Sequence, residues 1–500
     1  MKKARTIFVA VVSLSLIGSP SSHGQPQTPQ GDPAATPQDV LKRIEQVEAK
    51  LCPPVAIAGH DIVFHSLADQ MELYNVPGVS IAVINDGKIE WAKGYGTRET
   101  GVDSSVDINT LFQAASISKS VTALGTLHQV GSGTLDLDSN INDFLVSWQV
   151  PENAFTDKQP VTVRYLLCHG AGLNGHALGE YARGEKLPTP LQTLDGLPPS
   201  KVGAVRVVME PGTEFRYSGG GYLVLLQALV DVIGKPFPEI MKESVFDPVG
   251  MNRSGYFQER DYRRADNAAV GHNGMGSILE GYWRRVTNLA GGGLWTTPSD
   301  LCRYAMEIQK ALKGQSTVIS RELAEEMLTA QVGSYGLGLI LEGEGDCLTF
   351  GHGGNISGYN NTFFAYAHKG RGVAVMTNGQ RGSALSEEIV RAVAVVYDWL
   401  ELKPDVITPA LLSPEELNKY TGRFVFNNAL TANVSVEDGH LKMIGEDGRV
   451  FLWYPDADNH FYDLYSGWQL EFIFGEGDQV TGAVIAIAEG MGVKAEKADI

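Results

Sequence analysis

Strand-like segments form two groups in this 500-residue chain, and a long run of helical patches interrupts the first group. A hairpin is predicted over 79–96, with its turn at Asn85-Asp86-Gly87. Helical patches broken by glycine and proline follow over about 135–310. Strand patterns return at 336–341, 347–350, 362–366 and 373–376. This order predicts an α+β fold in which helices, including one at 61–74 and one at 386–402, flank an antiparallel sheet.

The sequence pattern changes near residue 403, where the second group of strands begins. Ser413-Pro414-Glu415-Glu416 reads as a capping box with proline at the first helical position. Short alternating strands separated by Asp-Gly turns are then predicted at 423–426, 433–436, 441–444, 450–454, 470–474 and 480–487. Their density predicts a small C-terminal all-β barrel or sandwich. We therefore expect one domain over 39–404 and a second over 405–500.

The N-terminus has the pattern of a secretory signal peptide, predicted at 1–24. Lys2, Lys3 and Arg5 precede an apolar run at 6–17 that is too short to span a bilayer. Residues 25–38 are rich in proline, glutamine and glycine, which predicts a disordered linker. A secreted or periplasmic protein without a stable membrane anchor is the expectation.

The formal net charge of -18 argues against nucleic acid as a partner, because phosphate binding needs clustered lysine and arginine. The four cysteines show no Cys-x-x-Cys spacing, and the chain has no His-Glu-x-x-His. No metal or other cofactor is therefore expected. Cys168 lies in an apolar run that favours a buried free thiol. The expected partner is a small-molecule or peptide substrate, and the oligomeric state stays open.

Ser116-Ile117-Ser118-Lys119 is the only Ser-x-x-Lys in the chain. Apolar residues recur at helical spacing from Ile117 to Leu127, which places Ser116 at a helix N-terminus and Lys119 one turn further on. A serine hydroxyl is a poor nucleophile until a base takes its proton, and lysine is such a base only when burial lowers its pKa. The alternative is an ordinary amphipathic helix with a solvated lysine, which the motif alone does not exclude.

Tyr217 stands before a glycine-rich turn, and an apolar helix is predicted after it, over 222–232. A tyrosine in this place can point its hydroxyl into a cleft and relay a proton between Ser116 and a leaving group. The alternative is a buried tyrosine that only completes a core.

Gly351-His352-Gly353-Gly354-Asn355 follows the strand predicted at 347–350. Glycines beside a strand let a substrate backbone approach closely. The amide of Asn355 is expected to join that of Ser116 in holding an oxyanion, and His352 is expected to donate to a substrate carboxylate or carbonyl. The alternative is a hairpin turn with an exposed histidine.

Ser-x-x-Lys at 116–119, Tyr-Ser-x at 217–219 and His-Gly-Gly at 352–354, in this order, resemble the serine β-lactamase and D-Ala-D-Ala carboxypeptidase family. Members with class C-like topology include esterases and D-aminopeptidases. The resemblance covers about 60–400. It implies that Ser116 is the acylated nucleophile, that Lys119 and Tyr217 transfer protons, and that the amides of Ser116 and Asn355 form the oxyanion hole. The segment after 405 resembles the lipocalin-like barrel that some D-aminopeptidases carry.

Two positions depart from the β-lactamase pattern. Gly219 stands where asparagine is usual, and His352-Gly353 stands where lysine and threonine are usual. We therefore expect an exported serine hydrolase that cleaves amides or esters of small acyl or D-amino acid substrates. The alternatives are a protein whose main activity is β-lactam hydrolysis and a non-catalytic binder of cell-wall peptides. The chain has no Gly-x-Ser-x-Gly, so an α/β-hydrolase is not indicated.

Overall fold

The computed structural model describes residues 38–59, 61–175, 179–257, 267–426, 431–446, 450–456, 460–464, 466–477, 479–488 and 491–498. The predicted signal peptide, and all of the predicted linker but its last residue, lie outside this part of the chain. Two compact units divide the described chain. One comprises 71–387 with 38–41, and the other comprises 42–70 and 388–500. The predicted border at residue 405 stays a prediction. Within the described residues, no helix has the length and apolarity needed to cross a membrane.

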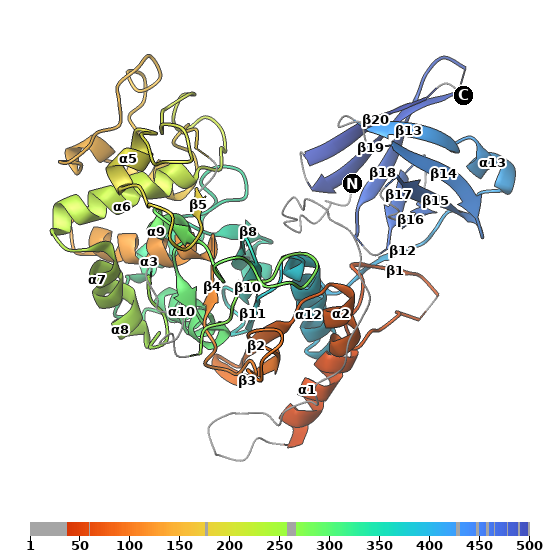
Figure 1. The fold of residues 1–500 in the computed structure, drawn as a ribbon, viewed down its shortest axis with the longest axis horizontal. Coiled ribbons are helices and arrows are strands. Elements are labelled where there is room, and N and C mark those ends of the chain that lie inside the picture. The colour runs from red at the N-terminus through yellow and green to blue at the C-terminus, as the bar shows by residue number, and fades with distance from the viewer. Residues whose placement is uncertain are drawn as a thin grey trace. The chain divides into compact units, whose positions relative to one another are not determined.

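The larger unit is built on an antiparallel six-stranded sheet in the order β3-β2-β11-β10-β9-β8 (Figure 1). Its strands are β2 (Gly78–Asn85), β3 (Lys88–Gly96), β8 (Ile340–Glu342), β9 (Thr349–Ile356), β10 (Tyr359–Tyr366) and β11 (Gly372–Thr377). The predicted hairpin supplies β3 and β2, and the strands after the insertion complete the sheet. The α+β prediction is confirmed.

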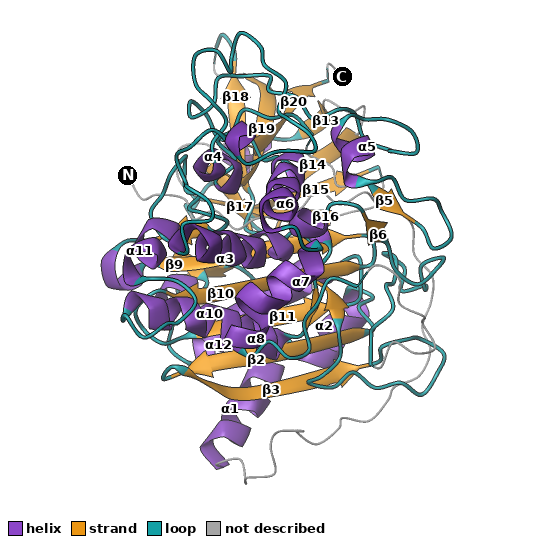
Figure 2. Ribbon diagram, turned by 90° about the vertical axis from the view of Figure 1, so that its left-hand side faces the viewer, coloured by secondary structure: helices purple, strands orange, loops and turns teal. Residues whose placement is uncertain are grey.

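Helices cover the sheet and carry the insertion between its two parts. α10 (Pro298–Leu312) contacts β2, β3, β10 and β11, and α3 (Ile117–Gly131) contacts β9 and β10 (Figure 2). The shorter helices of this unit are α4 (Val163–Leu167), α5 (Pro190–Leu194), α7 (Phe237–Met241), α8 (Asp247–Val249), α9 (Leu289–Gly292) and α11 (Arg321–Met327). α6 (Gly219–Ile233) packs against α9, which in turn packs against α3. A single hydrophobic core joins the sheet to this insertion.

Several predicted elements have different bounds in the structure. The helix predicted at 61–74 is α2 (Leu67–Leu73). It begins later than predicted because His65 is extended and pairs with Leu51. The Ser66 hydroxyl, which accepts from the Asp69 amide, then stands at the start of the helix. The strand predicted at 336–341 shrinks to β8, because Gly338 turns the chain at φ +82°. The helix predicted at 386–402 is α12 (Gly382–Val396).

The C-terminal strands close into an eight-stranded antiparallel barrel, which decides between the predicted barrel and sandwich. The strands are β13 (Gly422–Phe426), β14 (Thr431–Glu437), β15 (His440–Gly445), β16 (Val450–Pro455), β17 (His460–Asp463), β18 (Gln469–Phe474), β19 (Val480–Ala488) and β20 (Met491–Lys497). β17 and β20 were not predicted. β20 pairs with β13, although nearly the whole barrel sequence separates the two strands. No local sequence pattern therefore predicts that the barrel closes.

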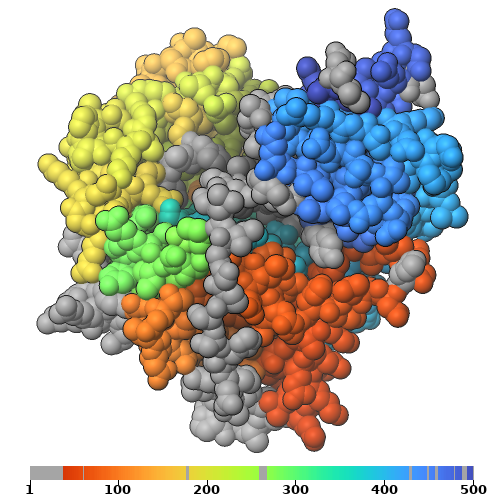
Figure 3. Space-filling model, turned by 45° about the vertical axis from the view of Figure 1, so that its right-hand side comes forward, coloured from red at the N-terminus to blue at the C-terminus, as the bar shows by residue number. Residues whose placement is uncertain are grey.

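Aromatic side chains fill the barrel. Tyr420, Phe424, Phe461 and Phe472 pack ring against ring with centroids 4.8–5.7 Å apart. Leu417 of α13 (Pro414–Asn418), the helix that the predicted capping box begins, adds to this core. The barrel residues are the blue body of Figure 3. The same unit holds α1 (Gln38–Ala49) from Lys42 on, and the parallel pair β1 (Val55–Ile57) and β12 (Asp405–Ile407).

Candidate active site

Ser116 stands at the N-terminus of α3, as predicted. The preceding residue, Ala115, has φ +50°, a left-handed conformation that is costly for a residue other than glycine. Ser118 holds this turn in place. Its hydroxyl donates to the Ala115 carbonyl at 2.5 Å and accepts from the Leu294 amide at 3.0 Å. The Ser116 side chain is partly exposed and does not cap the helix, so its hydroxyl stays available for chemistry.

Lys119 lies on the same face of α3, one turn beyond Ser116, and its side chain is 0% exposed. Its Nζ lies 3.0 Å from Ser116 Oγ and 2.8 Å from the Gly291 carbonyl oxygen in α9. Burial lowers the pKa of the Lys119 amine from 10.5 to about 7. A large fraction of Lys119 is therefore neutral near pH 7 and can accept a proton, so the solvated-lysine alternative does not hold.

Tyr217 completes a cluster around the serine. Its hydroxyl is hydrogen-bonded to Ser116, and its ring centroid lies 4.9 Å from Lys119 Nζ. Burial raises the Tyr217 pKa, so the phenol keeps its proton at neutral pH. The helix that follows begins at Gly219 rather than at residue 222. Ser218 caps this first glycine turn by accepting from the Gly221 amide at 3.2 Å.

The third predicted motif lies inside a strand and not in a turn. His352, Gly353, Gly354 and Asn355 all belong to β9, and the register with β10 runs unbroken past them. A Cβ atom on Gly354 would lie 2.0 Å from the carbonyl oxygen of Ala114, two residues before Ser116. The glycine therefore lets β9 approach the nucleophile's own segment, whereas the sequence had suggested that the substrate uses this space.

Gly354→Ala is expected to lower the midpoint temperature of unfolding and to reduce hydrolytic activity, because β9 must move away from the start of α3. Overpacking of this kind typically costs about 1–3 kcal/mol. Thermal unfolding followed by circular dichroism measures the change. Gly353→Ala is the matched control for stability, since a Cβ there would meet only the Asn361 carbonyl oxygen at 3.9 Å. Equal destabilisation by the two variants would contradict this account.

His352 is buried at 6% exposure, and its contact with a substrate stays a prediction. Its Nδ1 lies 2.5 Å from the Gly353 carbonyl oxygen, and its Nε2 lies 2.8 Å from the Tyr335 hydroxyl. A carbonyl only accepts, so Nδ1 carries the proton and Nε2 accepts from Tyr335. Burial, and then the charge of Lys119, lower the His352 pKa to about 3. The ring is neutral, and both of its nitrogens are occupied within the protein.

Several residues that hold this cluster together were not predicted from the sequence. Asn288 bridges two helices, because its Nδ2 donates to the Gly219 carbonyl and its Oδ1 accepts from the Gly291 amide at 2.9 Å. His169 lies against Tyr217 with ring centroids 4.2 Å apart, and its Nδ1 accepts from the Ser218 amide. No sequence spacing links these residues to the motifs.

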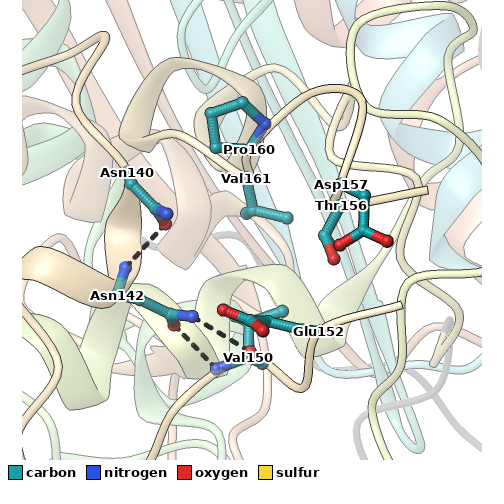
Figure 4. A pocket seen from close by; sticks show the side chains of 8 residues that line it. All are labelled: Asn140, Asn142, Val150, Glu152, Thr156, Asp157, Pro160 and Val161. Carbon is teal, nitrogen blue, oxygen red and sulfur yellow. Dashed lines mark hydrogen bonds between the residues drawn. The ribbon is translucent and has the colours of Figure 1, made fainter. Parts of the chain in front are cut away.

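The residues that line a surface pocket away from this cluster stabilise a loop. Figure 4 shows Asn140 and Asn142 among the eight residues that line it. Asn142 exchanges two hydrogen bonds with the backbone of Val150, and Asn140 accepts from the Asn142 amide at 3.0 Å. Its amide side chains thus fasten a loop. Among the described residues, no group of three or more His, Cys, Asp or Glu side chains gathers as metal ligands would.

The cluster of Ser116, Lys119 and Tyr217 on this fold is the arrangement of a serine hydrolase. The family model described as Beta-lactamase matches residues 65–397, two thirds of the chain, so the protein belongs to the beta-lactamase family. The chain is 23% identical over 424 residues to Penicillin-binding protein 4* of Bacillus subtilis, a match that covers 79% of this chain and 90% of that protein.

Two further relatives extend the comparison. The chain is 24% identical over 382 residues to a D-aminopeptidase of Gluconobacter oxydans, covering 73% of this chain and 66% of the relative. Among solved structures, the octameric penicillin-binding protein homologue from Pyrococcus abyssi matches with a TM-score of 0.58 and 23% identity, covering 86% of this chain and 98% of that one. At this identity the structural likeness establishes the fold.

Proposed function

We propose that this protein is an exported serine hydrolase that cleaves amide or ester bonds of small acyl substrates, including D-amino acid derivatives, through an acyl-enzyme on Ser116. The observation that carries the proposal is the 3.0 Å approach of a fully buried lysine amine to the Ser116 hydroxyl. Family membership and the D-aminopeptidase relative support it. Export is proposed from the basic residues and the short apolar run at the N-terminus.

Each proton in the proposed reaction has a donor and an acceptor. Neutral Lys119 takes the proton of Ser116 as Oγ attacks the substrate carbonyl carbon. The oxyanion is held by the backbone amides of Ser116 and Asn355. The first amides of a helix lack partners within it, which leaves that of Ser116 available. Tyr217, whose raised pKa keeps its proton on, donates that proton to the leaving group and is reprotonated by Lys119. Water then attacks the ester by the reverse path.

A fluorophosphonate probe tests the proposal directly, because it phosphonylates activated serines. We expect rapid labelling of the native protein at pH 8, and mass spectrometry should place the adduct on the peptide that contains Ser116. Label on another serine, or no label on protein that is folded by circular dichroism, would contradict the assignment.

The site bears differently on the two alternatives, a non-catalytic peptide binder and a β-lactamase. A non-catalytic peptide binder has no need of a lysine whose pKa is lowered to about 7 beside a partly exposed serine, so the site favours catalysis. β-Lactam hydrolysis remains a candidate activity of the same nucleophile, and a chromogenic cephalosporin measures it beside esters and amides.

A further inference from the structure

The residue at position 352 has no proton or charge to offer a substrate. Its Nδ1–H is bonded to Gly353, and its Nε2 is the acceptor for the Tyr335 hydroxyl. Tyr335 is itself 2% exposed and lies in the loop between α11 and β8. Because this hydroxyl donates to Nε2, it holds the imidazole in the neutral tautomer with the proton on Nδ1.

Glycine and aromatic residues lie next to this pair. Gly353 presents no side chain on the more open side of β9. Phe215 is 40% exposed, and its ring lies 5.5 Å from that of Tyr335 and 5.9 Å from that of His169. Among the described contacts of Ser116 and His352, Lys119 is the one cationic side chain, and its amine already bonds Ser116 Oγ and the Gly291 carbonyl.

A carboxylate that packs against these uncharged side chains loses hydration, and the loss costs several kcal/mol unless a cation or several donors replace the water. An uncharged amide or ester group loses less. The difference acts on the leaving-group side of the scissile bond in a substrate whose leaving group lies along β9, the strand that carries the proposed oxyanion amide of Asn355.

We propose that Tyr335 and His352 together determine specificity, and that the site around Ser116 selects acyl donors whose leaving group carries no carboxylate. This inference rests on the proposed serine hydrolase function. The favoured substrates are neutral esters and amides, including amides of amino acids, and compounds with a free carboxylate next to the scissile bond are disfavoured. Tyr335 acts through His352 and is a positioning residue.

The test uses two phenyl acetates that differ in one group, 3-acetoxybenzamide and 3-acetoxybenzoate. Each kcat/KM is divided by the rate of hydroxide hydrolysis of the same ester, which removes the intrinsic difference between leaving groups. We expect the native protein to favour the amide by at least about tenfold at pH 8. The preference should persist in about 0.5 M salt, which screens the general repulsion from the net charge of -18.

Two variants make the test specific to this pair. His352→Lys places a cation on β9 beside the nucleophile and should move the ratio at least about tenfold toward the carboxylate. Tyr335→Phe removes the donor to Nε2, so the ring is free to turn or to take up a proton, and the preference should shrink. Tyr335→His keeps a hydrogen-bond donor at this position and should retain more of the preference for the amide than Tyr335→Phe does.

Equal or better hydrolysis of 3-acetoxybenzoate by the native protein in high salt would overturn the inference, as would a ratio unmoved in folded His352→Lys or Tyr335→Phe protein. A native protein that hydrolyses neither ester refutes the proposed function instead. Hydrolysis of either ester that survives Ser116→Ala refutes the assignment of the nucleophile.

Discussion

Ser116→Ala is expected to lower kcat/KM for ester and amide hydrolysis by at least about 10⁴-fold, as loss of a nucleophile does in other serine hydrolases. The reason is covalent, because the proposed acyl-enzyme forms on the Ser116 hydroxyl. The fold should be unchanged, since the Ser116 side chain makes no cap bond in α3. Steady-state hydrolysis of p-nitrophenyl acetate, beside thermal unfolding, measures both quantities.

Ser132→Ala is the matched control, because Ser132 is an exposed serine at the other end of the same helix. It should leave turnover unchanged. Ser118→Ala is a second comparison. It breaks the bonds to Ala115 and Leu294 that hold the turn, so it should reduce both stability and activity. Residual acyl-enzyme turnover in folded Ser116→Ala protein would refute the mechanism.

Lys119→Met is expected to lower kcat/KM by about 10³-fold, within the range for loss of a positioned base, and to remove its pH dependence near neutrality. In the native protein kcat/KM should rise with pH through about 7, since Lys119 accepts a proton only when neutral. A pH–rate profile of both proteins measures this. An unchanged acid limb in the variant would show that another group titrates there.

The same substitution should stabilise the protein at neutral pH. The Lys119 pKa is about 7 in the folded state, whereas a lysine exposed to water has a pKa of 10.5, so the unfolded chain binds more protons between these values. The free energy of unfolding of the native protein should therefore rise with pH from 7 to 10.5. At pH 7 Lys119→Met should be more stable by a few kcal/mol, since each pKa unit is worth about 1.4 kcal/mol.

Chemical denaturation at pH 7 and at pH 10 measures this difference, which should shrink at the higher pH. Lys158→Met is the control for charge alone, because Lys158 is 63% exposed and pairs with Glu210 at the surface. Exposed pairs contribute about 0–1 kcal/mol, so that variant should change stability little at either pH. A Lys119→Met protein less stable than the native one at pH 7 would show that burial does not lower the pKa.

The parts of the fold predicted best are those that short-range contacts control. The start of α3 at Ser116 follows from apolar residues three and four apart, and the hairpin of β2 and β3 follows from its Asn-Asp-Gly turn. The capping box at Ser413 also forms as predicted, with both of its hydrogen bonds present. In each case the interacting residues lie within a few positions of one another.

The predictions that failed depend on distant segments. The strand predicted at 347–350 extends through His352 as β9, because β10 pairs with it on one side and β8 reaches its start on the other. The strand β20 was missed although Met491, Val493 and Ala495 alternate with glycine, lysine and glutamate. It is held by pairing with β13 and β19 to close the barrel.

The three motifs, their order, and the helix that brings Lys119 to Ser116 follow from the amino-acid sequence alone, because helix spacing is a property of four consecutive residues. The protonation of the site follows from the folded protein. The Lys119 pKa depends on burial beneath Tyr217 and against Gly291, which is 172 residues away. The tautomer of His352 depends on Tyr335. Desolvation and hydrogen-bond partners are contributed by distant segments, and they set the charge of each group only once the chain has folded.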